Sequence, residues 1–126
     1  RPDVAVIHAQ RVDRQGNVLI EGILGVQKEA VLAAQRSVVT VEEVVESLAG
    51  IHPNACVLPH WTVSMIAVVP GGAFPSYAHG HYPRNNAYYR AWVALARERA
   101  SFKGWLEREV LAAGPEAFAV YARRVA

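Results

Sequence analysis

The polar side chains best suited to chemistry gather in one short stretch, Gly71 to His79. It follows an apolar run, Met65 to Val69, which must end at Pro70 or lie at a sheet edge because proline has no N–H to donate to a neighbouring strand. Gly71 and Gly72 then permit backbone torsions, or a close approach by a ligand, that other residues forbid. The polar groups that follow are Ser76, Tyr77 and His79. Sheets of α/β proteins commonly hold ligands at such strand ends, so the pattern predicts a binding loop, although an ordinary tight turn would use the same residues.

The two histidines at the end of this loop have a spacing that metal sites use. His79 and His81 would project from one face of an extended chain, and imidazole is a common zinc ligand. Gly80 and Pro83 disfavour a regular strand there, however, and no third histidine has a clear spacing to the pair. We therefore predict loop histidines and no metal site.

Two adjacent carboxylates, Glu42 and Glu43, could supply a general base or an acyl-accepting group. We expect them at the start of a short helix over residues 42–48, where neighbouring side chains point about 100° apart and cannot form a facing pair. The helix dipole favours acidic residues at this end without any catalytic role. Cys56 lies in an apolar run with no cationic neighbour, which predicts an unreactive thiol. The sequence thus contains no complete active site, and we assign no catalytic residue to it.

The elements that would position the loop alternate between apolar strands and amphipathic helices. Short β-branched runs predict strands over residues 3–9, 18–21, 37–41, 55–58 and 62–69. The first of these runs is nearly continuous in apolar residues, which predicts a strand buried on both faces. Residues 25–36 carry apolar side chains at helical spacing and predict a helix. The order strand, turn, helix, strand is a βαβ pattern, whose strands are parallel.

Beyond the loop the pattern changes to helix. A long helix with an aromatic face is predicted by Tyr88, Trp92, Leu95, Phe102 and Leu106, and Gly104 could interrupt it. Gly114 and Pro115 favour the start of a last helix, packed through Phe118, Tyr121 and Val125. The whole pattern predicts an α/β fold with a mostly parallel sheet and flanking helices, ending in C-terminal helices.

Composition narrows the class of protein. The chain has 126 residues, 52% of them hydrophobic and 19% charged, which predicts a single globular domain over residues 1–126. A net charge of +2 without a basic run argues against nucleic acid as a partner. No apolar stretch approaches the ~20 residues of a membrane span, so we expect no membrane association. One cysteine precludes an internal disulfide and suits the reducing cytoplasm.

Three blocks of the sequence are similar to one known family, the A (alpha) subunits of family I CoA-transferases, especially of the glutaconate type. The blocks are residues 3–45, 57–82 and 88–111. The most specific motifs are the turn with Asp13, Gly16 and Asn17, the pair Glu42-Glu43, and the loop Pro70-Gly71-Gly72-Ala73. The family often has a histidine after this loop motif, where the present chain has Phe74.

The resemblance implies an open α/β domain of the CoA-transferase type. It also implies an exchange of CoA between an acyl-CoA and a carboxylic acid, with no tightly bound cofactor and the CoA thioester as co-substrate. The family's acyl-accepting glutamate lies on the partner beta subunit, in a Ser-Glu-Asn-Gly-like motif that this sequence lacks. Glu21, followed by Gly22, imitates the end of that motif, but we interpret it as a strand-end residue. The implied chain is the C-terminal part of an alpha subunit whose N-terminal half is missing. The implied substrate and CoA pocket contains Gly71, Gly72, Ser76, Tyr77, His79 and Asn17.

Two other functions remain open from the sequence. A related CoA-ester hydrolase, which opens rings in steroid breakdown, would need no second acid as acceptor. Alternatively, the chain could be a non-catalytic scaffold that only assembles the partner subunit. The sequence does not identify the acid, because side chains of both subunits would select it.

Overall fold

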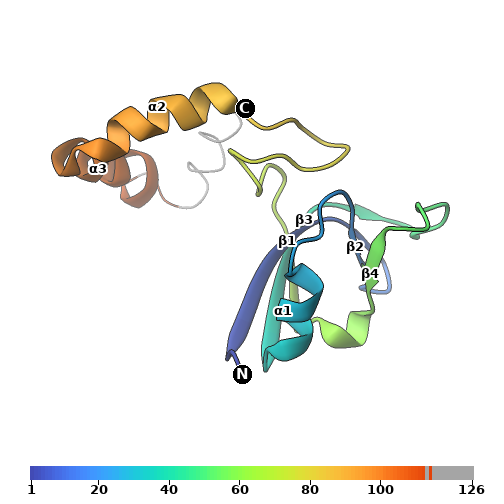
Figure 1. Ribbon diagram of the computed structural model, residues 1–126. Coiled ribbons are helices and arrows are strands. Elements are labelled where there is room, and N and C mark those ends of the chain that lie inside the picture. Colours follow the sequence, from blue (N-terminus) through green and yellow to red (C-terminus); the bar gives the residue numbers. More distant parts are fainter. Residues whose placement is uncertain (113, 115–126) are drawn as a thin grey trace. The chain divides into compact units, whose positions relative to one another are not determined.

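A computed structural model describes residues 1–112 and 114 of the chain, which divides into two compact units (Figure 1). The first unit comprises residues 1–72 and 78–81, and the second comprises residues 73–77 and 82–126. The single domain expected from the chain's length stays a prediction. None of the helices in the described part is long and apolar enough to cross a membrane.

The first unit is built on a five-stranded sheet. In chain order its strands are β1 (Val4–Asp13), β2 (Val18–Ile20), β3 (Arg36–Val45), β4 (Cys56–Leu58) and β5 (Met65–Val68). They lie in the order β4-β2-β1-β3-β5, with β1, β3 and β5 parallel and β2 antiparallel to both of its neighbours. The predicted α/β fold is confirmed, but the sheet is mixed, because a short turn returns the chain from β1 to β2.

One helix, α1 (Gln27–Ala33), lies inside the predicted range 25–36 and packs against the sheet (Figure 1). Its buried residue, Val31, belongs to a cluster that also contains Ile7, Ala9, Val12, Val18, Ile20, Val39, Val41 and Leu58. Strands β1 and β3, on either side of α1 in the sequence, are parallel partners from Val4↔Arg36 onward. The predicted βαβ pattern is therefore confirmed.

Burial along β1 departs from the expectation of a strand covered on both faces. Ala5 and Ile7 are each 8% exposed, whereas Val4 and Val6 are 50% and 69% exposed. Met65 on β5 is also exposed, and it pairs with Val38 of β3, which itself pairs with Val6. One face at this end of the sheet thus forms the core, and the opposite face is open in the part of the chain described.

The predicted helix over residues 42–48 is wrong, because β3 continues through Glu42 and Glu43 to Val45. The far end of β1 pairs with it in register, with Arg11 opposite Glu43 and Asp13 opposite Val45. The Arg11 Nε–H donates to a Glu43 oxygen over 2.9 Å. These pairings outweigh the modest preference of a helix start for acidic residues. In a strand, neighbouring side chains point to opposite faces, so the two glutamates have separate environments.

The second unit contains α2 (Asn86–Arg97), α3 (Arg99–Leu106) and a π-helical turn, η2 (Glu107–Leu111). The side chain of Asn85 caps α2 by accepting from the Tyr88 N–H over 2.8 Å. The single long helix expected here is interrupted at Glu98, which has extended torsions, and Gly104 lies inside α3. The expected last helix, with Phe118, Tyr121 and Val125, falls outside the described residues.

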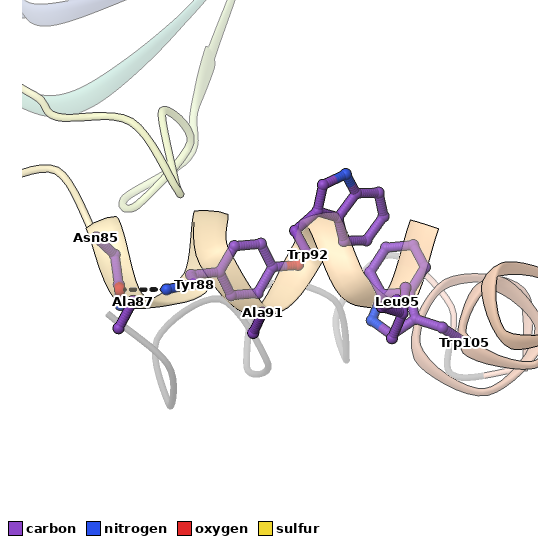
Figure 2. A pocket seen from close by; sticks show the side chains of 7 residues that line it. All are labelled: Asn85, Ala87, Tyr88, Ala91, Trp92, Leu95 and Trp105. Carbon is purple, nitrogen blue, oxygen red and sulfur yellow. Dashed lines mark hydrogen bonds between the residues drawn. The ribbon is translucent and has the colours of Figure 1, made fainter. Parts of the chain in front are cut away.

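The predicted aromatic face is present and connects the two helices. Trp92 stacks on Tyr88 with ring centroids 6.2 Å apart and meets the edge of Trp105 at 4.7 Å. Its ring also contacts Phe102 at 6.0 Å. An apolar pocket of about 420 Å³ lies along this face (Figure 2) and is lined by Asn85, Ala87, Tyr88, Ala91, Trp92, Leu95 and Trp105.

Candidate active site

Parallel strands bring residues from distant parts of the sequence together in the first unit. His8 of β1 and Thr40 of β3 are partners in register, so their side chains share a face. The Nδ1 of His8 lies 2.8 Å from the Thr40 hydroxyl oxygen. The Nε2 of His8 lies 2.7 Å from an oxygen of Glu42, two residues further along β3. Because a carboxylate can only accept, Nε2 donates in this bond.

The turn with the two glycines is attached to this carboxylate. The Gly71 N–H donates to the second oxygen of Glu42 over 2.7 Å. The Glu42 side chain is only 4% exposed and that of His8 15% exposed. The Val69 N–H donates to the Val41 carbonyl over 2.8 Å, so the turn begins where β5 leaves the sheet. A buried carboxylate thus joins a histidine to the predicted binding loop.

The two glycines of the turn serve different needs. Gly71 has a φ of +82°, and a methyl group at its Cβ position would meet open space. Gly72 has no positive φ, but a Cβ there would lie 2.7 Å from Cε1 of His8 and 2.9 Å from the Val69 carbonyl oxygen. Gly71 is therefore required by backbone torsion and Gly72 by close contact with the imidazole.

The contacts around His8 anchor both the backbone and the ring of this residue. The carbonyl of His8 accepts from the Gln27 side chain over 3.1 Å, which anchors the strand to α1. The Thr40 hydroxyl, which contacts Nδ1, also lies 3.4 Å from the Ile7 carbonyl, to which it can donate. The imidazole is therefore held through both of its ring nitrogens.

His79, a predicted site residue, lies in a second, polar pocket of about 280 Å³ in the same unit. The pocket is lined by Glu21, Gly22, His52, Asn54, Ala55 and His79. The Asn54 N–H donates to Nδ1 of His52 over 3.1 Å, so the proton of a neutral His52 ring lies on Nε2. The Glu21 N–H donates to the Gln10 side chain over 2.8 Å, which fixes the strand end that forms one wall. His79 thus lies in a pocket that can offer both donors and acceptors.

Ser76 and Tyr77 belong to the second unit, whereas the two glycines belong to the first. The Ser76 N–H donates to the Ala73 carbonyl over 2.8 Å, which makes a turn. Phe74, where the resembling family often has a histidine, packs edge-on against Tyr88 with centroids 4.7 Å apart. An apolar ring at this position therefore has a packing role on α2.

Asn17 lies in the turn between β1 and β2, where its side chain has structural partners. Its amide donates to Asp13 over 2.9 Å, and its oxygen accepts from the His60 N–H over 3.1 Å. The Asp13 carboxylate also accepts from the backbone N–H groups of Gln15 and Asn17. These bonds, led by the one from the Asn17 side chain, hold the pKa of Asp13 below its usual 3.8.

We expect Asp13→Asn to lower the free energy of unfolding by about 1–2 kcal/mol at pH 7. A neutral amide would replace the charged carboxylate that accepts from three N–H donors, two in the backbone and one in the Asn17 side chain. A depressed pKa stabilises the fold above the unfolded-state pKa, and this stability is lost as the pH falls through the folded-state pKa. The difference between wild type and variant should therefore shrink below about pH 4. Denaturant titrations at pH 7 and pH 3 measure this difference in the free energy of unfolding.

The control is Glu46→Gln, which removes an exposed ion pair with Arg14 and should change stability by less than about 0.5 kcal/mol. Equal losses for both variants would contradict the role of Asp13.

The sequence interpretation did not assign His8, Thr40 or the buried role of Glu42. A histidine inside the apolar run at residues 3–9, and a threonine and a glutamate spaced by two at residues 40 and 42, were the signals present. They become informative only when strand pairing aligns them. Among residues 1–112 and 114, no cluster of three potential metal ligands occurs.

Comparisons with known proteins agree on one family. Residues 1–68 match the family described as Coenzyme A transferase. The A-type chain of the 3-oxoadipate CoA-transferase of Pseudomonas knackmussii is 57% identical over 110 residues, which are 87% of this chain and 39% of that protein. The A-type chain of the glutaconate CoA-transferase of Acidaminococcus fermentans is 28% identical and is matched by 86% of this chain over 34% of its own length.

Two solved structures have a similar fold. The crystal structure of glutaconate coenzyme A-transferase from Acidaminococcus fermentans superimposes with a TM-score of 0.81 and 26% sequence identity. The match covers 98% of this chain and 40% of the chain in that structure. The structure of the decarboxylase AibA/AibB has a TM-score of 0.61 and 34% identity, covering 85% of this chain and 40% of its own. The chain thus spans about two fifths or less of these relatives.

Proposed function

Because this chain belongs to the coenzyme A transferase family, we propose that it is part of an alpha subunit that helps form the acyl-CoA site of a CoA-transferase. The observation that carries the proposal is the Gly71–Gly72 turn, held at the end of a parallel strand over His8 and Glu42. Open space beside Gly71 leaves room for a ligand to approach the backbone. Gly71, Gly72, Ser76, Tyr77, His79 and Asn17 are the proposed pocket residues, with Asn17 acting through the turn that it stabilises.

The exchange needs a carboxylate nucleophile. The carboxylate, which is a glutamate side chain in this family, attacks the thioester carbonyl, and the carbon–sulfur bond breaks. The CoA thiolate departs, and a mixed anhydride of the acyl group and the glutamate remains. The thiolate then attacks the glutamyl carbonyl, which releases the acid and forms an enzyme–CoA thioester. A second acid reverses these steps and leaves as the new acyl-CoA.

The glutamates near the proposed site are all engaged in other interactions. Glu42 is bonded to His8 and Gly71, and Glu43 to Arg11. Glu21 lies 3.9 Å from the same arginine. A carboxylate that is held by a cation or buried under a turn is a poor nucleophile, since attack would break those bonds. This supports an acyl-accepting glutamate on a partner beta subunit.

The relatives suggest the kind of acid. One acts on 3-oxoadipate and another on glutaconate, and both acids are short dicarboxylates. The 57% identity to the first favours 3-oxoadipate or a close analogue for this chain. The polar pocket with His52 and His79 could supply donors for the remote carboxylate.

A trapping experiment on the complete alpha chain, assembled with its partner, tests this proposal. We expect incubation with 3-oxoadipyl-CoA or succinyl-CoA, followed by hydroxylamine, to leave a hydroxamate on one partner glutamate. Peptide mass spectrometry should find Glu21, Glu42 and Glu43 unmodified, both in the complex and in the isolated alpha chain. A hydroxamate on any of these three residues would overturn the assignment and make this chain the nucleophile's carrier.

A second candidate reaction is decarboxylation, which the likeness to AibA/AibB favours. Release of carbon dioxide without any acid acceptor would distinguish it from CoA transfer. Uptake of water with formation of a new free acid group by opening of a ring, again without an acceptor, would instead indicate the ring-opening hydrolase. A scaffold role would be supported if the complex kept full activity after mutation of Gly72, Ser76 and Tyr77.

A further inference from the structure

The carboxylate of Glu42 lies under the Gly71–Gly72 turn and takes no part in the acyl transfer outlined above. Its two oxygens accept bonds from His8 and from the Gly71 N–H, each over 2.7 Å. We propose that Glu42, supported by His8, is a positioning residue that holds the turn in the geometry the acyl-CoA requires. This inference rests on the proposed function and adds to it the residues that hold the Gly71–Gly72 turn in position.

Stability alone does not explain a carboxylate at this place. The Glu42 side chain is 4% exposed, and removing a charge from water is unfavourable even when it is hydrogen-bonded. Apolar side chains in place of both partners of a buried pair such as His8 and Glu42 are often neutral or stabilising. Glu43, the next residue, is 47% exposed and pairs with Arg11. What Glu42 adds is a charged acceptor for the Gly71 N–H, which gives a shorter and stronger bond than a neutral one.

His8 applies a second restraint to the same turn. A Cβ at Gly72 would lie 2.7 Å from the ring, so the glycine backbone rests directly against the imidazole. The ring is held by Thr40 on one side and by Glu42 on the other. Because Glu42 and His8 are bonded to each other, a shift of either moves the supports of both Gly71 and Gly72. Displacement of a site by about 1 Å can lower a rate about 100-fold.

Two substitutions at Glu42, made in the complete alpha chain and measured in its complex with the partner, test the inference. Glu42→Leu keeps the bulk and removes the acceptor, and Glu42→Gln keeps a neutral acceptor. The matched control is Glu43→Gln, which changes the exposed neighbour on the other face. Amide hydrogen exchange of the peptide around Gly71 reports on the turn directly, and steady-state kinetics with an acyl-CoA and an acid separate kcat from KM.

In the Glu42→Leu variant we expect the Gly71 amide hydrogen to exchange at least about tenfold faster than in wild type. We expect kcat to fall about 10- to 100-fold, and KM to stay within about threefold of the wild-type value. Glu42→Gln should give intermediate values, since it still accepts from the turn, and Glu43→Gln should match wild type. Glu42→Leu leaves the Nε2–H of His8 and the Gly71 N–H without their acceptor, so its melting temperature should fall. Glu42→Gln keeps an acceptor, so its melting temperature should stay close to that of wild type, and this variant separates positioning from folding.

Unchanged exchange in both Glu42 variants, or unchanged kcat despite faster exchange, would overturn the inference. If Glu42→Leu fails to fold, the same two readouts on Glu42→Gln decide. If the wild-type complex turns over no acyl-CoA, the proposed function has failed, and exchange alone then decides whether Glu42 holds the turn.

Discussion

Replacing Gly72 with valine will lower turnover of the CoA-transferase that we propose by at least about 100-fold, while the fold loses only about 1–3 kcal/mol of stability. A Cβ at this position would lie 2.7 Å from Cε1 and 2.8 Å from Nδ1 of His8, and 2.9 Å from the Val69 carbonyl oxygen. Side chains do not approach so closely, so either the imidazole or the turn must move. Either movement displaces the loop that we propose to contact the acyl-CoA. Steady-state kinetics and chemical unfolding of the same preparation measure the two losses.

Two further variants separate contact from torsion at this turn. Gly71→Ala meets open space but has a φ of +82°, so it should destabilise the turn by about 1–2 kcal/mol without touching His8. His8→Ala removes the ring that blocks Gly72, so Gly72→Ala should be less harmful in the His8→Ala background than in wild type. Additive effects would show that the imidazole contact is unimportant. Proportional losses of stability and turnover in Gly72→Val would mean that the glycine serves folding only.

Leu19→Ala should lower the free energy of unfolding by about 3–4 kcal/mol, the largest stability effect that we expect in the first unit. Leu19 is the middle residue of β2, all three residues of which are buried, and its own exposure is 0%. It lies between Arg11 of β1 and Val57 of β4 in the sheet. Removing its side chain leaves a cavity in a strand with no open face to relax into. Urea titration of the complete alpha chain measures the loss.

Leu32→Ala is the matched control, because it makes the same chemical change on α1 at a side chain that is 54% exposed. It should lower stability by less than about 1 kcal/mol. Similar losses for both leucines would show that β2 is not covered on both faces. A loss near zero for Leu19→Ala would have the same meaning.

Short-range patterns in the sequence were sufficient to predict the central strands and the helix of the first unit. Apolar runs at residues 3–9 and 37–41, with an amphipathic segment between them, predicted the parallel pair β1 and β3 and the helix α1. These features follow from hydrophobic periodicity, which is local in the chain. The same was true of the family resemblance, which depends on the order of short motifs and is confirmed by the match of residues 1–68.

The segment at residues 42–45 shows where local reasoning misleads. Two glutamates before a pair of valines suit a helix start, yet the segment extends β3. The reason lies 32 residues away, where Arg11 and the end of β1 offer a partner strand and a counter-charge. Pairing with a distant segment outweighs a preference of a few tenths of a kcal/mol.

The candidate site belongs to the tertiary structure. The glycine turn could be predicted from the sequence, because adjacent proline and glycine residues indicate the end of a strand and a turn. Its supports were not, since His8, Glu42 and Gly71 are each about 30 residues apart or more along the chain. Only the parallel register of β1, β3 and β5 brings them together, and it also turns Glu42 inward and Glu43 outward. Side-chain chemistry was thus set by the sequence, whereas strand pairing decided which side chains meet, because alternation along a strand has no meaning until a partner defines its inner face.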